Sequence, residues 1–268
     1  MSRRSVSISP STTWVQFLQI CQGPVEDQGP RYRSRHAQLL FVIYFLVSGE
    51  CLTRLNYIAL VPAATFPTQL TQIVLAVQHL LFTGIAPHNI QLVGDSAGGN
   101  LILQLISHIL HPMADVPTLS VASPFGNILL ISPWVCLFPK AEGTIISNSK
   151  KDLFTIPAIL HYANFVRENT PESGHLYLDH MNVPEGWFDD ITKVTRQVLI
   201  TAGEYEVLKD SITVFAKRIC EVHPVATYIV QENGIHADPM LDFSVPAPKT
   251  IGSLTPKMVD WLASGCSD

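Results

Sequence analysis

The sequence predicts an α/β domain built on a mostly parallel sheet that helices cover on both faces. Short apolar runs rich in Val, Ile and Leu alternate with stretches whose apolar residues recur at helical spacing. Strands separated by helices favour a parallel sheet with both faces buried. We expect strands at 90–93, 127–133, 197–203 and 226–230, and helices at 66–81, 101–110, 157–168, 211–221 and 253–264.

The chain length of 268 residues favours a single domain, 1–268, since one α/β domain of this size is ordinary. Two parts of this domain depart from the regular alternation. Residues 1–60 form an atypical N-terminal segment, in which the apolar run 37–48 is either a buried strand or a buried helix. Residues 140–190 hold several prolines, aromatic residues and one short helical pattern, which predicts a cap-like insertion that lies over the sheet and shapes a pocket.

Composition and charge exclude several classes of protein. A content of 47% hydrophobic and 15% charged residues argues against a disordered chain, and a net charge of −5 without a basic stripe argues against nucleic-acid binding. The run 37–48 is shorter than the roughly 20 residues that span a bilayer as a helix. The N-terminus lacks the apolar segment of a secretory signal, the C-terminus carries no peroxisomal tripeptide, and the five cysteines show no zinc-site spacing. We therefore expect a cytoplasmic protein without a metal site, and the oligomeric state stays open.

The segment GDSAG at 94–98 matches the motif G-x-S-x-G and lies between an expected strand and an expected helix. This is the context of a nucleophile elbow, a sharp turn through Asp95 and Ser96 that presents the serine hydroxyl at the carboxyl edge of the sheet. The turn presses Gly94 and Gly98 against other backbone, where only a residue without Cβ fits. Ser96 is the candidate nucleophile, and the backbone N–H of Ala97, at the positive end of the helix, is the first candidate oxyanion donor. A glycine-rich turn without chemistry is the competing interpretation.

A candidate base and a candidate acid follow in the order Ser, acid, His that the motif requires. His236 lies in the turn-rich loop 233–239 after the last expected strand, where tight geometry could hold a general base. The acid that orients the imidazole should follow the preceding strand, and Glu206 fits that place. Glu204 and Asp210 compete with Glu206, because spacing alone does not choose among the three.

The other nine histidines lack such a setting. Solvated or packing roles are expected for the six that fall in or just after helices or in the insertion. Those in or just after helices should lie near the surface, and the rest fall in the insertion. The first group is His79, His108 and His111, and the second is His161, His175 and His180.

Three blocks of sequence stand out: QLVGDSAGGNLILQL (91–105), TAGEYEVLKD (201–210) and NGIHADP (233–239). Together they resemble the hormone-sensitive lipase-like branch of the α/β-hydrolase superfamily, especially its fungal members, from about residue 60 to the C-terminus. The resemblance implies an α/β-hydrolase fold with a cap and a Ser–acid–His triad that acts on carboxylic esters without a metal or an organic cofactor. It also implies that the acid is Glu206.

The chain departs from this family at two upstream places. The A-P-E-x-x-x-P region of the family is matched only in part by LVPAATFP (60–67), which lacks the glutamate. The H-G-G motif, whose glycine amides complete the oxyanion hole, is absent from the sequence. Where it should fall, about 70 residues before the nucleophile, Gly23 is followed by Pro24, which has no amide hydrogen. Loss of one oxyanion donor costs about 10²–10³ in kcat. Either the chain is degenerate or shortened at this place, or a different N-terminal segment rebuilds the hole, with a donor near Gly23 as the candidate.

The residues and the resemblance together predict a serine hydrolase that cleaves carboxylic esters of small lipophilic compounds. In this interpretation Ser96 attacks the ester carbonyl, His236 transfers the proton, and Glu206 holds the imidazole. Trp134 and the pair 187–188 suggest a mostly apolar pocket. The resemblance to fungal members extends the expectation to secondary-metabolite or toxin biosynthesis.

Two alternatives remain open at this point. A pseudo-hydrolase that binds a small apolar ligand or a partner protein would explain the missing H-G-G motif. The intact order of serine, acid and histidine argues against it. An acyltransferase or a dehydratase-like enzyme, in which water is excluded from the pocket, is the third possibility.

Overall fold

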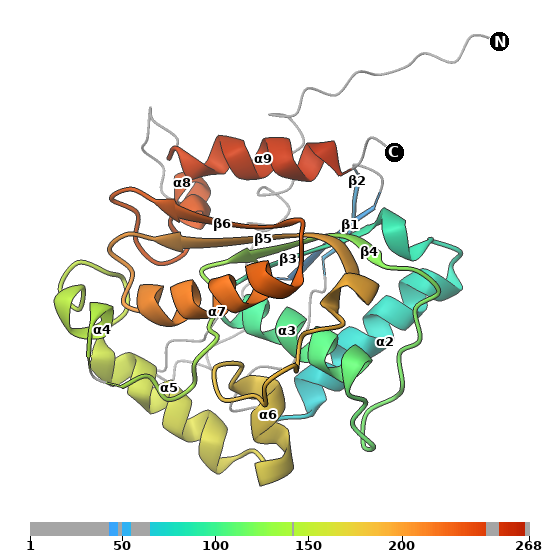
Figure 1. Cartoon of the computed structure of the whole chain (residues 1–268), viewed down its shortest axis with the longest axis horizontal. Helices are drawn as coiled ribbons and strands as arrows, with labels where there is room; N and C mark the ends of the chain where they lie inside the picture. The colour runs from blue at the N-terminus through green and yellow to red at the C-terminus, as the bar shows by residue number, and fades with distance from the viewer. Residues whose placement is uncertain (1–42, 48–49, 55–64, 141, 245–251, 266–268) are drawn as a thin grey trace, which may run out of the picture.

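A computed structural model of the chain describes residues 43–47, 50–54, 65–140, 142–244 and 252–265. A six-stranded sheet in the order β2-β1-β3-β4-β5-β6 lies at the centre, with helices on both faces (Figure 1). The strands are β1 (Ile43–Val47), β2 (Glu50–Arg54), β3 (Ile90–Asp95), β4 (Phe125–Ile131), β5 (Thr195–Gly203) and β6 (Ala226–Gln231).

The four strands β3 to β6 pair in parallel, which confirms the predicted parallel sheet. All seven residues of β4 are buried, with no alternation between buried and exposed positions, as expected where helices cover both faces. The prediction placed its end at 133, which is wrong by two residues. The strand ends at Ile131 because Ser132 adopts a positive φ of 46° and turns the chain.

The N-terminal edge of the sheet is antiparallel. β1 pairs with β3 in antiparallel fashion along its whole length, and β2 pairs with the other edge of β1. The apolar run 37–48, which the sequence left open between strand and helix, therefore contributes a strand at 43–47. Parallel neighbours need a long crossover, whereas only two residues separate β1 from β2 in the sequence, so their antiparallel direction follows from the length of the connection.

Helices cover the sheet in two sets (Figure 1). On one face lie α2 (Thr68–Phe82), α3 (Ala97–Leu110) and α7 (Lys209–Val222), and on the other lie α8 (Asp238–Ser244) and α9 (Leu254–Ser264). A 3-10 turn, η1 (Pro87–Asn89), precedes β3. α9 places Leu254, Met258 and Leu262, spaced four residues apart, on a buried cluster of the sheet. The expected helix at 253–264 thus serves as the cover of this second face.

Residues 140–190 contain α4 (Thr144–Ser147), α5 (Ile156–Glu168), η2 (Glu172–Gly174) and α6 (His175–Leu178), and η3 (Ile191–Lys193) follows. α5 and α6 lie outside α3 and α7, as a further layer on that face (Figure 1). The predicted insertion therefore does not pack on the strands themselves. It packs on helices instead, and α3 is buried from residue 97 to 108 because it lies between the sheet and this layer.

Trp187 and Phe188 do not lie beside Ser96, contrary to the expectation that they help to form its pocket. The Trp187 ring stacks on His111 at 3.8 Å, and its Nε1 donates to Ser107 Oγ at 3.1 Å. Ser107 is in the last turn of α3 and His111 follows it, so at a rise of 1.5 Å per residue they lie roughly 16 Å and roughly 22 Å along the helix from Ser96. Phe188 packs against Phe215 in the core.

Two histidines lie deeper than expected. His108 is fully buried rather than near the surface, and its two ring nitrogens bond Pro117 O at 3.0 Å and the Met113 N–H at 3.1 Å. His108 therefore has one of the two roles that were expected, packing, but in the core rather than near the surface. His180, in the insertion, is also fully buried, and burial lowers its pKa to about 3.

Candidate active site

Ser96 lies at a strained turn between β3 and α3. Its φ of 50° and ψ of −114° are rare for a residue with a side chain. The neighbouring glycines make the turn possible, because a Cβ on Gly94 would lie 2.6 Å from the carbonyl carbon and oxygen of Gly98. The G-x-S-x-G spacing is therefore a packing requirement of this turn, and it leaves the Ser96 hydroxyl exposed to the loops that follow β5 and β6.

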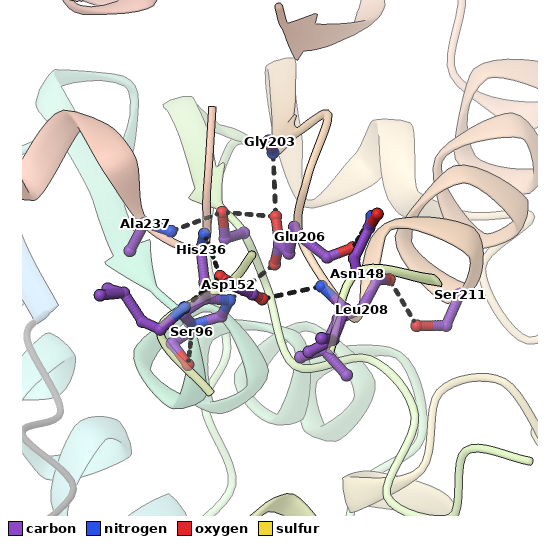
Figure 2. Close-up of polar contacts among 12 residues, drawn as sticks. Ser96, Asn148, Asp152, Gly203, Glu206, Leu208, Ser211, His236 and Ala237 are labelled. Carbon is purple, nitrogen blue, oxygen red and sulfur yellow. Dashed lines mark hydrogen bonds and ion pairs between the residues drawn. The ribbon is translucent and has the colours of Figure 1, made fainter. Parts of the chain in front are cut away.

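Those loops bring His236 and Glu206 to Ser96 (Figure 2). His236 Nε2 lies 2.8 Å from Ser96 Oγ, and His236 Nδ1 lies 2.6 Å from Glu206 Oε1. Glu206 is fully buried and His236 is nearly so. With Nδ1 donating to the carboxylate, Nε2 is left as the acceptor for the serine hydroxyl. The result is a continuous hydrogen-bonded chain from serine to histidine to glutamate.

The structure also distinguishes Glu206 from the other two candidate acids, Glu204 and Asp210. Glu204 Oε2 accepts from the Asn233 N–H at 2.8 Å, and Asp210 Oδ2 accepts from the Thr144 N–H at 2.8 Å. Both carboxylates thus bond backbone amides away from the imidazole. Among the three acids, Glu206 is the one that the structure places on His236.

Glu206 is held by further donors on its second oxygen. Oε2 accepts from the Gly203 N–H at 2.9 Å and from the Ser132 hydroxyl at 2.9 Å. Ser132 Oγ in turn accepts from the Ala237 N–H at 3.0 Å, so this hydroxyl links the acid to the residue after His236. Sequence reasoning missed Ser132. Its position directly after β4, at the carboxyl edge of the sheet, is the signal that could have found it.

Burial and charge act against each other on the imidazole. Burial alone would lower the pKa of His236, but the Glu206 carboxylate, helped by its hydrogen bond and by the charges of Asp152 and Asp95, raises this pKa above its ordinary value. Burial raises the pKa of Asp95 to about 6, against the opposing effect of His236. The site is thus a buried imidazole that three carboxyl groups surround.

The expected oxyanion donors are only partly described. Ala97 is the first residue of α3, where backbone N–H groups have no preceding helical carbonyl to bond. Its amide is therefore placed at the positive end of the helix, beside Ser96. Gly23, the other candidate, lies outside the described residues, as does most of the partial 60–67 match apart from its last three residues.

An apolar cavity of about 50 Å³ opens beside the elbow. Its wall includes Ala97 and Leu101 of α3 together with Trp134, Leu137 and Phe66. Trp134 is thus the one of the predicted aromatic residues that the structure places here. Over the described ranges, no group of three His, Cys, Asp or Glu side chains could hold a metal ion, and no helix is long and apolar enough to cross a membrane.

The profile of the steryl acetyl hydrolase family matches residues 57–247, well over half of the chain. A search of curated proteins gave no significant match. The sequence-based match therefore rests on the family profile, which includes all three residues of the hydrogen-bonded chain.

Solved esterases share the fold at low identity. The esterase EstE5 is 20% identical, with a TM-score of 0.64 over 82% of this chain and 68% of that one. Carboxyl esterase 2 from the mycorrhizal fungus Tuber melanosporum is 20% identical, with a TM-score of 0.61 over 79% and 65%. An esterase from the bacterial hormone-sensitive lipase family is 19% identical, with a TM-score of 0.58 over 77% and 62%.

These likenesses confirm the predicted α/β-hydrolase fold. The chain spans less than two thirds of the length of most of the solved esterases that it resembles, with values from 62% to 68%.

Proposed function

Because the chain belongs to the steryl acetyl hydrolase family, we propose that it is a serine hydrolase that cleaves carboxylic esters. The observation that carries the proposal is the chain of hydrogen bonds from Ser96 through His236 to Glu206, at 2.8 Å and 2.6 Å, in a site closed to solvent on its acid side. This arrangement is the one that nucleophilic catalysis by serine requires.

The geometry supports the following sequence of steps. The Ser96 hydroxyl attacks the ester carbonyl and passes its proton to His236 Nε2, while Glu206 stabilises the imidazolium through Nδ1. The negative charge that develops on the carbonyl oxygen is stabilised by the Ala97 N–H and by a second donor, for which Gly23 is the candidate. Collapse releases the alcohol, which takes the proton from His236, and water then hydrolyses the acyl-enzyme by the same route.

We propose that the substrate is an ester between a lipophilic alcohol and acetate or another short acyl group. The apolar wall of the cavity beside Ala97 supports a lipophilic substrate, and the description of the family points to acetate esters of sterols. The role in secondary-metabolite or toxin biosynthesis remains a prediction from the sequence.

Labelling with a fluorophosphonate, combined with hydrolysis of p-nitrophenyl acetate and a steryl acetate, tests this function. We expect the wild-type protein to be labelled and to turn over the esters, and Ser96→Ala to lose both properties. A folded wild-type protein that is neither labelled nor active would overturn the proposal. That result would favour the pseudo-hydrolase, which the missing H-G-G motif supports.

A further inference from the structure

The start of the insertion contacts both loops that carry the proposed acid and base. Asp152 lies between α4 and α5, more than 50 residues before Glu206 and more than 80 before His236. Its Oδ1 accepts from the His236 N–H at 2.8 Å, and its Oδ2 accepts from the Val207 N–H at 2.7 Å (Figure 2). One carboxylate therefore joins the backbone of the base to the backbone beside the acid.

The same carboxylate is itself fixed in place. Its Oδ1 also accepts from the N–H of the next residue, Leu153, at 2.8 Å, which sets the direction of the side chain. Four residues earlier, Asn148 Nδ2 donates to the carbonyls of Glu204 and Glu206, each at 3.1 Å. The segment 148–152 thus bonds both amide and carbonyl groups around the acid.

Asp152 also acts on the imidazole through its charge. The carboxyl groups that face His236 are Glu206 from the loop after β5, Asp95 from the elbow and Asp152 from the insertion, and the ring of Phe154 meets the imidazole edge-on at 4.7 Å. The negative charge of Asp152 favours the protonated imidazole. Removal of the Asp152 carboxylate should therefore change the titration of His236 as well as the position of its loop.

We propose that Asp152 is a positioning residue, which holds the His236 and Glu206 loops together from the insertion and so keeps its own negative charge beside the imidazole. The inference rests on the proposed function of these two residues. Its physical basis is that one rigid acceptor shared by two loops fixes their separation, and a displacement of about 1 Å in a catalytic group can lower the rate roughly 100-fold. The insertion is then part of the proposed catalytic machinery as well as a cover for α3.

The test compares Asp152→Asn with Asp189→Asn, a matched change at an exposed aspartate that does not contact the site. An asparagine can accept from one of the two amides, but its NH₂ group then faces the other, so one loop loses its anchor. We expect kcat/KM of Asp152→Asn to fall about 10- to 100-fold. We also expect the acidic limb of its pH profile to move to lower pH by about half a unit, because the charge that raises the His236 pKa is gone. Asp189→Asn should change neither value.

A purely structural loss would lower the rate by the same factor at every pH and leave the limb in place, which would overturn the proposal. So would a rate within twofold of wild type. Asp152→Glu keeps the charge and displaces it, so we expect its limb to stay and its rate to fall. If Asp152→Asn does not fold, an unchanged rate in Asp152→Glu overturns the proposal.

The His236 titration can also be followed by NMR on protein with ¹³C-labelled histidine, which needs no turnover. A wild-type protein that hydrolyses no ester contradicts the proposed function. An unchanged His236 titration in Asp152→Asn contradicts the positioning role, whether or not the protein is active.

Discussion

The elbow that carries Ser96 and the loops that carry His236 and Glu206 differ in the range of the contacts that hold them. The turn of the elbow is shaped by residues that are close in sequence, since Gly94 and Gly98 approach each other across it. Two backbone hydrogen bonds of Ser96, to the Ile131 carbonyl and from the Trp134 N–H, each at 2.9 Å, then join this turn to the end of β4. The two loops are held by partners 55 to 105 residues away, namely Asp152, Asn148 and Ser132. The nucleophile is thus a local feature of the sequence, whereas the geometry of its partners depends on the insertion and on the end of β4.

Substitution of the proposed catalytic acid, Glu206, should have the largest effect on catalysis. Glu206→Gln keeps the shape of the side chain but removes the charge that orients the imidazole, so we expect kcat to fall about 10⁴-fold. Glu204→Gln, two residues away, removes a charge but keeps an oxygen that can accept from the Asn233 N–H, so it should change the rate less than twofold. Steady-state kinetics on p-nitrophenyl acetate measures both. Equal losses in the two variants would mean that the acid has been misassigned.

A substitution in the elbow should have the largest effect on the free energy of unfolding. Gly94→Ala places a Cβ 2.6 Å from the Gly98 backbone, and we expect the free energy of unfolding to fall by about 3 kcal/mol. Gly84→Ala is the control, because its site has a positive φ of 90° but no atom within 4 Å. This variant should lose only about 1 kcal/mol for the backbone conformation. Urea unfolding measures both values, and similar losses would show that crowding does not shape the elbow.

Ser132 offers a smaller test of the long-range contacts. Ser132→Ala removes a donor to Glu206 Oε2 and leaves the Ala237 N–H without its acceptor. Because hydrogen bonds to charged groups contribute about 1.5–3 kcal/mol, we expect kcat to fall about 10- to 100-fold. Ser211→Ala, which removes only a bond to the Leu208 carbonyl, is the matched control. A wild-type rate in Ser132→Ala would show that the acid needs no support from β4.

The smallest expected effect is in the pH dependence of the wild-type protein. His236 must be neutral to accept the serine proton, so activity is lost as pH falls through its pKa. That pKa is raised above the ordinary value of 6.5, and the acidic limb of kcat/KM should therefore lie above pH 6.5. A pH profile of the rate at ester concentrations well below KM measures this limb. A limb below 6.5 would mean that burial outweighs the carboxylates.

Sequence reasoning found the parts of the molecule whose signals are local. The strands β3 to β6 each contain a short run of apolar residues, and the GDSAG turn needs its glycines for steric reasons, so both appear in the sequence itself. The choice of Glu206 over Glu204 and Asp210 depended on which carboxylate the fold turns inward, which spacing does not encode. The contribution of Asp152 depends on the packing of the insertion. Trp187 was misplaced because an aromatic pair after a loop gives no sign of which end of α3 it covers.

The central claim is that Ser96 forms a covalent acyl intermediate, and trapping that intermediate tests it most directly. The wild-type protein is mixed with p-nitrophenyl acetate, quenched in acid during the first turnovers, digested, and analysed by mass spectrometry, with Ser96→Ala treated in parallel. We predict an acetyl group on the peptide that contains Ser96 in the wild-type protein, mapped to that serine, and none on the corresponding peptide of the variant. Turnover of the ester without an acetyl group on Ser96, or with the acetyl group on another residue, would contradict the account.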